Sequence, residues 1–128
     1  MSSESSRVLI VDDHVDAAES LAIVLSTEGY DVRTCADGAD AYETIARWRP
    51  RVALIDLDLP TIGGLELARR ARALDFGDAL LLAAVTGYGR DSDRESSREA
   101  GFDAHLVKPV DPDAVLHWIA GSGISRAK

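Results

Sequence analysis

The chain is poor in three features that would each point to a class of protein. One cysteine in 128 residues, Cys35, excludes an internal disulfide and fits a reducing cytosol. No apolar run approaches the roughly 18–20 residues that a membrane-spanning helix needs, and no signal peptide is visible. The 14 Lys and Arg are outnumbered by 22 Asp and Glu, and the net charge of −8 disfavours a nucleic-acid-binding surface. We therefore expect a cytoplasmic protein with neither membrane nor nucleic-acid partners.

Length and apolar content indicate one globular domain. The chain lies in the common domain range of roughly 100–150 residues, and 46% of it is hydrophobic. We predict a domain over residues 7–121, with flexible segments at 1–6 and 122–128 that complete the chain. Cys35 ends an apolar stretch, so we interpret it as a small buried residue rather than a reactive thiol.

Five short apolar runs alternate with segments of helical period. Continuous apolar runs are typical of parallel strands that helices cover on both faces. The helical segments end at Gly29, before Pro50 and at Gly101, residues that commonly stop helices. The pattern predicts an α/β fold, a (βα)5 doubly wound sandwich with right-handed crossovers. The predicted strands are Val8–Val11, Val32–Cys35, Val52–Ile55, Leu80–Val85 and Ala104–Val107.

Residues with phosphate or metal chemistry stand where four of these runs end. Asp12 and Asp13 follow the first run and Asp56 follows the third. Thr86 and Lys108 follow the fourth and fifth. Ligands of doubly wound sheets bind at the carboxyl ends of the strands. The order of elements therefore predicts one pocket with three carboxylates, a hydroxyl and an ammonium.

The charges of this pocket indicate a divalent cation. Two like charges ~4 Å apart repel by about 4 kcal/mol at an effective dielectric near 20, and one lysine cannot balance three carboxylates. Hard oxygen ligands suit Mg²⁺, with Mn²⁺ as the alternative. Carboxylates, a metal, a lysine and a hydroxyl suit phosphoryl transfer, in which one carboxylate can be the nucleophile. Asp56 is central in the predicted sheet and is the candidate.

Four motifs cover the chain from about Arg7 to Gly121: VLIVDDHVDAAESL, VALIDLDLPTIGGLELARRAR, VTGYG and AGFDAHLVKPVDPDAVLHW. In content and order they resemble the motifs of two-component response regulator receiver domains. The resemblance implies a flavodoxin-like fold with strand order 2-1-3-4-5. It also implies a signalling switch with only self-phosphorylation and slow self-dephosphorylation chemistry, rather than an enzyme. The third and fourth motifs look most like receivers attached to hybrid sensor kinases, which makes a phosphorelay the expected setting.

Roles follow from the resemblance residue by residue. Asp56 would accept a phosphoryl group from a phosphohistidine of a sensor histidine kinase or a histidine phosphotransfer domain. Asp13, Asp56 and the backbone carbonyl of Asp58 would hold Mg²⁺, with Asp12 in support. Thr86 and Lys108 would bind the phosphoryl oxygens. The Lys108–Pro109 peptide bond would be cis, and the downstream partner stays open.

His105 departs from the family's pattern, which has Tyr or Phe three positions before the lysine. We hypothesise that His105 takes this switch position and makes the on/off balance mildly pH-dependent; a surface histidine at a strand end is the alternative. For Asp58 we hypothesise a side chain that alters the lifetime of phospho-Asp56, or else a solvated acid that offers only its carbonyl. His14 is interpreted as a helix-start residue rather than a metal ligand.

Two other functions are weighed against the switch. Asp56-Leu57-Asp58 resembles the nucleophile motif of haloacid-dehalogenase-like phosphatases, but that motif normally opens the domain, and Asp12-Asp13 precede it here. An interaction module that is never phosphorylated would require a broken site, whereas all five residues are intact. The polar segment 92–100 carries both charge signs, which favours a solvated face over a dimer surface. We expect a monomer or a weak homodimer.

Overall fold

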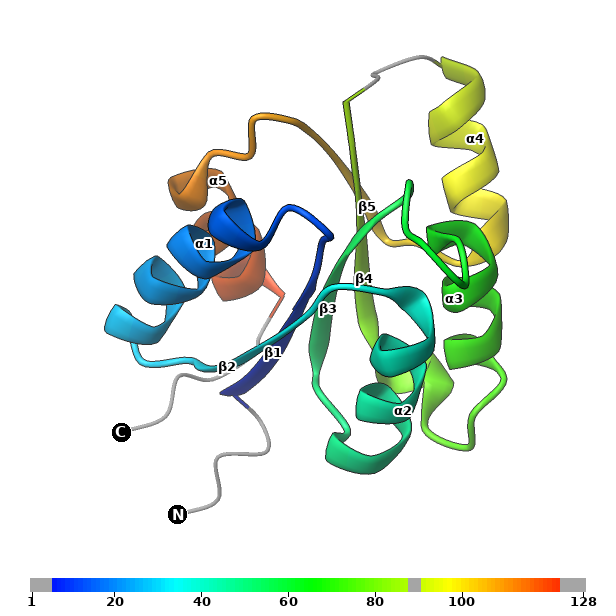
Figure 1. Cartoon of the computed structure of the whole chain (residues 1–128), viewed down its shortest axis with the longest axis horizontal. Helices are drawn as coiled ribbons and strands as arrows, with labels where there is room; N and C mark the ends of the chain where they lie inside the picture. The colour runs from blue at the N-terminus through cyan, green and yellow to red at the C-terminus, as the bar shows by residue number, and fades with distance from the viewer. Residues whose placement is uncertain (1–5, 88–90, 123–128) are drawn as a thin grey trace.

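The computed structural model describes residues 6–87 and 91–122, with no side-chain description for 91–93. Five parallel strands form one sheet in the order β2-β1-β3-β4-β5, as predicted. The fold is α/β and flavodoxin-like (Figure 1). The strands are β1 (Arg7–Val11), β2 (Asp31–Cys35), β3 (Val52–Asp56), β4 (Leu81–Thr86) and β5 (Ala104–Val107). The helices are α1 (Val15–Thr27), α2 (Gly38–Trp48), α3 (Gly64–Arg72), the short 3-10 helix η2 (Gly77–Ala79), α4 (Asp91–Ala100) and α5 (Pro112–Gly121).

Two apolar cores lie on opposite faces of the sheet. Successive side chains of a strand point to opposite faces, so Val8 and Ile10 join one core while Leu9 and Val11 join the other. Helices α1 and α5 cover the first face, and α2, α3 and α4 cover the second (Figure 1). The central strands β1, β3 and β4 are buried on both faces, as their continuous apolar sequences predict.

The two outer strands differ from that prediction. Arg33 and Thr34 of β2 are exposed, and no residue of β5 is fully buried. Both strands lie at an edge of the sheet, where one side of the strand has no neighbour and a face is only partly covered. The apolar runs therefore marked the positions of all five strands, but full burial applies to the three inner ones.

Local signals set the helix ends. Gly29, with φ of 99°, follows α1, and Gly101, with φ of 109°, follows α4, a conformation that glycine adopts at little cost. The side chain of Asp111 accepts a hydrogen bond from the N–H of Asp113, and Pro112 opens α5. No helix among the described residues is long and apolar enough to cross a membrane. The predicted flexible ends lie almost entirely outside the described residues.

Candidate functional site

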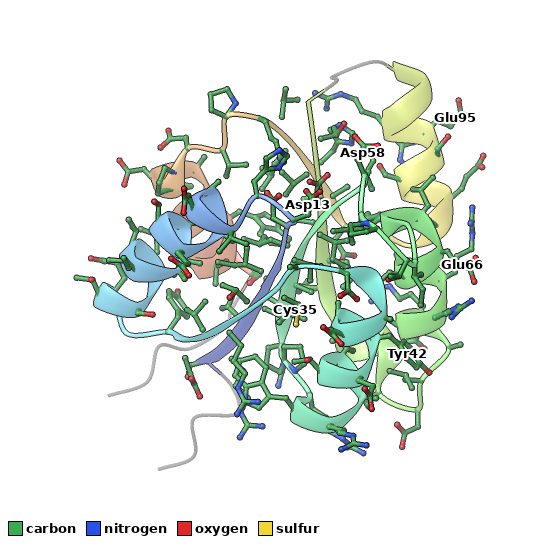
Figure 2. All side chains as sticks on the ribbon, in the orientation of Figure 1. Asp13, Cys35, Tyr42, Asp58, Glu66 and Glu95 are labelled. Atoms are coloured by element: carbon green, nitrogen blue, oxygen red, sulfur yellow. The ribbon has the colours of Figure 1, made fainter. Side chains whose placement is uncertain are left out.

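The polar residues predicted from the strand ends meet at one edge of the sheet. Asp56 and Thr86 are the last residues of β3 and β4, and both are 3% exposed. Asp12 follows β1 directly, and Lys108 follows β5. Parallel pairing of the strands aligns these ends. The pairing of β4 with β5 continues one step past β5, where the N–H of Lys108 donates to the carbonyl of Thr86 at 2.8 Å. Figure 2 shows Asp13 and Asp58, from two different loops, at this same edge.

Lys108 joins two of the carboxylates. Its Nζ lies 2.9 Å from Oδ2 of Asp56 and 3.1 Å from Oδ2 of Asp12. The other oxygen of Asp56 accepts a hydrogen bond of 2.9 Å from the N–H of Asp58, and the other oxygen of Asp12 accepts one of 2.9 Å from the N–H of His14. Both carboxylates, that of the buried Asp56 and that of the half-buried Asp12, are therefore held by a main-chain donor and by the shared ammonium of Lys108.

These contacts separate the acidities of the two carboxyl groups. Burial raises the pKa of Asp56 above its usual range, and the N–H of Asp58 and the ammonium of Lys108 only partly offset this effect. Burial acts in the same direction on Asp12, but the N–H of His14 and Lys108 outweigh it and leave its pKa lowered. Burial disfavours the ammonium of Lys108, yet its two carboxylate partners raise the pKa of Lys108 overall.

The donor set of the edge fits a hard divalent cation. Ligand atoms of Asp12, Asp13, His14 and Asp56 all lie within 4.8 Å of one another. Asp13 is the more open acid, with a side chain that is 42% exposed, whereas that of Asp12 is 12% exposed. Three carboxylates at this spacing, two of them paired with Lys108, provide the oxygen donors that Mg²⁺ prefers. The residues present therefore fit the predicted metal.

His14 stands closer to the acids than its sequence position alone indicated. It precedes α1, as predicted for a helix-start residue. Its Nδ1 also lies 3.0 Å from an oxygen of Asp12, 3.3 Å from one of Asp13 and 3.4 Å from Nζ of Lys108. The sequence shows that His14 follows Asp12 and Asp13, but it does not show whether the imidazole ring points toward their carboxylates. The imidazole of His14 therefore contacts the charged groups of the site directly.

Two loop residues frame Asp56. Asp58 has an exposed side chain and contributes its N–H to Asp56. Gly64, at the start of α3, lies so close to the end of β3 that a Cβ there would sit 2.6 Å from the carbonyl oxygen of Asp56 and 2.7 Å from the Cα of Leu57. Glycine is therefore required at this position to let α3 begin against the strand end.

His105 faces α4. Its Nδ1 lies 3.3 Å from Oγ of Ser97, a residue that is 2% exposed. The hydroxyl of Ser97 also donates to the carbonyl of Arg94 at 2.9 Å, so this one hydroxyl links His105 to the backbone of α4. His105 is half-buried, and a link to a buried hydroxyl distinguishes it from a plain surface histidine. The sequence held no sign of this bond.

The structure describes several of the other predicted features, but not all of them. The Lys108–Pro109 bond is cis. Cys35 is half-buried, and its Sγ lies 3.4 Å from Oγ1 of Thr44. Arg94, Glu95, Arg98 and Glu99 of α4 are exposed, which agrees with a solvated face. The remaining charged residues predicted on that face, at 90, 91 and 93, lie outside the described side chains.

Comparisons with known proteins all point to one family. The model of the response regulator receiver domain matches residues 8–120. An uncharacterised 14.6 kDa protein of Leptolyngbya boryana is 35% identical over 112 residues, which are 88% of this chain and 86% of that protein. The response regulator MprA of Mycobacterium leprae is 39% identical over 110 residues, 86% of this chain and 47% of its own length. The chain thus spans about half the length of the response regulators that it matches.

Solved structures agree with the fold. A CheY-like response regulator receiver domain protein from Methanospirillum hungatei has a TM-score of 0.85 and 33% identity, covering 91% of this chain and 92% of that one. The receiver domain of the sensor histidine kinase PA1611 from Pseudomonas aeruginosa has a TM-score of 0.83 and 28% identity, covering 91% and 95%. That structure has a magnesium ion coordinated in its active site cleft.

Proposed function

The chain belongs to the family of response regulator receiver domains, the phosphorylation-dependent switches of two-component signalling, and we propose that Asp56 is its phosphoacceptor. The observation that carries the proposal is the setting of this one carboxylate. Asp56 is the buried last residue of the central strand β3, and each of its oxygens is held by a donor, the N–H of Asp58 or the ammonium of Lys108. Such donors stabilise charge that builds on transferring oxygens.

The donor is a phosphohistidine on a sensor histidine kinase or a histidine phosphotransfer domain. An oxygen of Asp56 attacks the phosphorus, the phosphorus–nitrogen bond breaks, and the imidazole nitrogen leaves with the electron pair and takes up a proton. Lys108 then binds a phosphoryl oxygen, and the hydroxyl of Thr86 donates to another. A cavity of about 640 Å³ beside Lys108, lined mainly by apolar residues of α1 and the β5–α5 connection, supports a partner approach from this side.

The metal is Mg²⁺, or Mn²⁺ in its place. Asp12, Asp13, Asp56 and the carbonyl of Asp58 would hold it, and when bound it neutralises charge on the transferring phosphoryl group. Lys108 and the two main-chain donors orient the carboxylates for this role. The magnesium ion in the related receiver from Pseudomonas aeruginosa supports this assignment.

Thr86 and His105 carry the response to phosphorylation. Thr86 lies at the site and is buried, while His105 stands on the neighbouring strand, where its register partner is Ala84. Movement of Thr86 toward the phosphoryl group vacates space that the His105 ring enters, and its contact with Ser97 of α4 then changes. Altered packing at α4 would present the new surface to a downstream protein.

Acetyl phosphate with Mg²⁺, followed by intact mass, tests the proposal. We expect one labile phosphoryl adduct on the wild-type chain and none on Asp56→Asn. Asp16→Asn, which changes an exposed acid in the first turn of α1, should keep the adduct. An Asp56→Asn protein that is phosphorylated like the wild type would contradict the assignment.

Neither the fold nor the family match favours the phosphatase or the unphosphorylated module. The same preparation should leave p-nitrophenyl phosphate without continuous turnover. Steady hydrolysis that is lost in Asp56→Asn would instead support the phosphatase. A chain that takes up no phosphoryl group from acetyl phosphate or from any phosphohistidine donor would support the module.

A further inference from the structure

The end of the sheet opposite the acidic site is rich in arginine. Figure 2 shows nitrogen-bearing side chains gathered near the start of β1 and the end of α2, away from Asp13 and Asp58. These positions hold five of the fourteen basic residues of a chain whose net charge is −8. We name this group the arginine edge: Arg7, Arg33, Arg47, Arg49 and Arg51. The last four are exposed, and the side chain of Arg47 is 82% exposed.

Aromatic rings hold three of these guanidinium groups in place. The guanidinium carbons of Arg33 and Arg7 lie 4.6 Å and 5.4 Å from the centre of the Trp48 ring. That of Arg49 lies 4.7 Å from the centre of the Phe76 ring. Stacking uses the flat face of a guanidinium and leaves its N–H edge free to bind a carboxylate with two parallel hydrogen bonds. The arginine edge is therefore pre-organised.

Most of this charge has no internal partner. Glu43 pairs with Arg47 at 3.3 Å. Among the described side chains, those of residues 6–87 and 94–122, the other four arginines have no carboxylate oxygen within 4.0 Å. Asp31 stands two residues before Arg33, and Asp75 stands next to Phe76, whose ring contacts Arg49; neither makes an ion pair with the edge. Arginines used only to balance the acidic chain would be expected to pair with these neighbours.

Arg49 also occupies a costly backbone conformation. It caps α2 with φ of 55° and ψ of 65°, the left-handed region where helices commonly end on glycine. A side chain there costs about 1 kcal/mol or more relative to glycine. Strain of this kind is a sign of functional constraint when the surrounding structure has no other need for the residue. Among the described residues, the Phe76 ring is the one ring, ion-pair or side-chain hydrogen-bond contact of the Arg49 side chain.

Residues of the arginine edge line two hollows. One, of about 370 Å³, is lined by Arg33, Glu43, Thr44, Arg47 and Trp48, and its single carboxylate, that of Glu43, is paired with Arg47. The second, of about 180 Å³, is lined by Arg49, Arg51 and Phe76 among others. Each hollow combines two arginines with one aromatic ring. Neither hollow includes a residue of the acidic site.

We propose that the arginine edge binds an acidic segment of a partner protein, one rich in Asp and Glu. Carboxylates match the forked N–H edges of Arg33, Arg49 and Arg51, and the two hollows accept side chains between them. A nucleic acid is the less favoured occupant, because a long polyanion would be repelled by a chain of net charge −8. A short acidic segment meets only the local positive surface. Binding here leaves Asp56 accessible and does not depend on its phosphorylation.

Fluorescence anisotropy of the full chain with a short labelled peptide of alternating Asp and Glu tests this proposal. We expect saturable binding that weakens as salt increases. Arg49→Gly should weaken it by about two- to fivefold, and Arg49→Gly/Arg51→Gln by about fourfold or more. Because Arg49→Gly relieves the backbone strain, its melting temperature should be unchanged or higher. A lost peptide affinity would then not be a folding defect.

Arg69→Gln/Arg70→Gln is the matched control. It removes the same charge from α3, where both arginines face Glu66, and it should leave peptide binding intact. Equal losses of peptide affinity in the two double variants would show that the net charge of the chain, and not the arginine edge, determines binding. That result would overturn the proposal. Tighter binding of an oligothymidine of the same length would make the surface a nucleic-acid site instead, and absence of binding at low salt would refute it outright.

Discussion

Nζ of Lys108 lies 2.9 Å from Oδ2 of Asp56, although 52 residues separate the two in the chain. The same ammonium reaches Asp12 at 3.1 Å. One lysine therefore reduces the mutual repulsion of the carboxylates that we expect to hold the metal. This places Lys108 in competition with the cation for the same negative charge.

Replacing this lysine should make the site depend more on metal. We expect Lys108→Met to lower the free energy of unfolding by about 1–3 kcal/mol without metal, because Asp56 loses a charged donor while buried. Added Mg²⁺ should then raise the melting temperature of the variant more than that of the wild type. Arg70→Met, which removes a cation paired with Glu66 on α3, serves as control. An identical Mg²⁺ response in all three proteins would refute the competition.

The close approach of Gly64 to the end of β3 gives a second prediction. A methyl group there meets backbone atoms of Asp56 and Leu57 that cannot move independently of the strand. Gly64→Ala should therefore lower the free energy of unfolding by about 1–3 kcal/mol, measured by urea denaturation. Gly63→Ala is the matched control, since a Cβ at Gly63 meets nothing within 4 Å. Equal stability of the two variants would show that the loop relaxes freely.

Cys35 gives a chemical test of burial. Burial raises the pKa of its thiol above the usual range, and the hydrogen bond with Thr44 only partly opposes this. The thiolate is the reactive form, so alkylation by iodoacetamide should be slow in the native protein and should accelerate at higher pH than in the urea-unfolded chain. Mass spectrometry follows the reaction cleanly because the chain has one cysteine. Native and unfolded proteins that react alike would contradict the assigned burial.

His105 can be tested through the pH dependence of activation. If His105 takes the switch position and makes activation pH-dependent, activation of the wild type by a phosphate mimic such as beryllofluoride should differ between about pH 6 and about pH 8. His105→Phe should lose this difference. Ser97→Ala keeps the histidine but removes its partner on α4; it should retain the pH response. A response unchanged in His105→Phe would exclude His105 as its source.

The sequence predicted the parts of the fold that depend on local pattern and chain order. Apolar runs located all five strands, and the residues after them, Asp12, Asp56, Thr86 and Lys108, met at one edge because parallel strands align their carboxyl ends. The exposure of Arg33 was not predicted, because an edge position is a property of the whole sheet. The bond between His105 and Ser97 likewise depends on how α4 packs against β5.

The arginine edge illustrates the limit of sequence reasoning. The sequence groups Arg47, Arg49 and Arg51 within five residues, but nothing in it links them to the distant Arg7 and Arg33. They come together because the amino ends of β1 and β2 and the end of α2 lie at one end of the sheet. Aromatic contacts with Trp48 and Phe76 then fix the side chains. Such a surface is visible only after the strands are aligned.

Chemical trapping of the phosphorylated residue tests the central claim most directly. Borohydride reduces an aspartyl phosphate to homoserine, so acetyl phosphate, Mg²⁺ and borohydride, followed by peptide mass spectrometry, mark the acceptor itself. The buried carboxylate at the end of β3, with its donors Lys108 and the N–H of Asp58, predicts homoserine at position 56 and at no other acid of the site. Homoserine at position 12, 13 or 58, with Asp56 intact, would contradict the account.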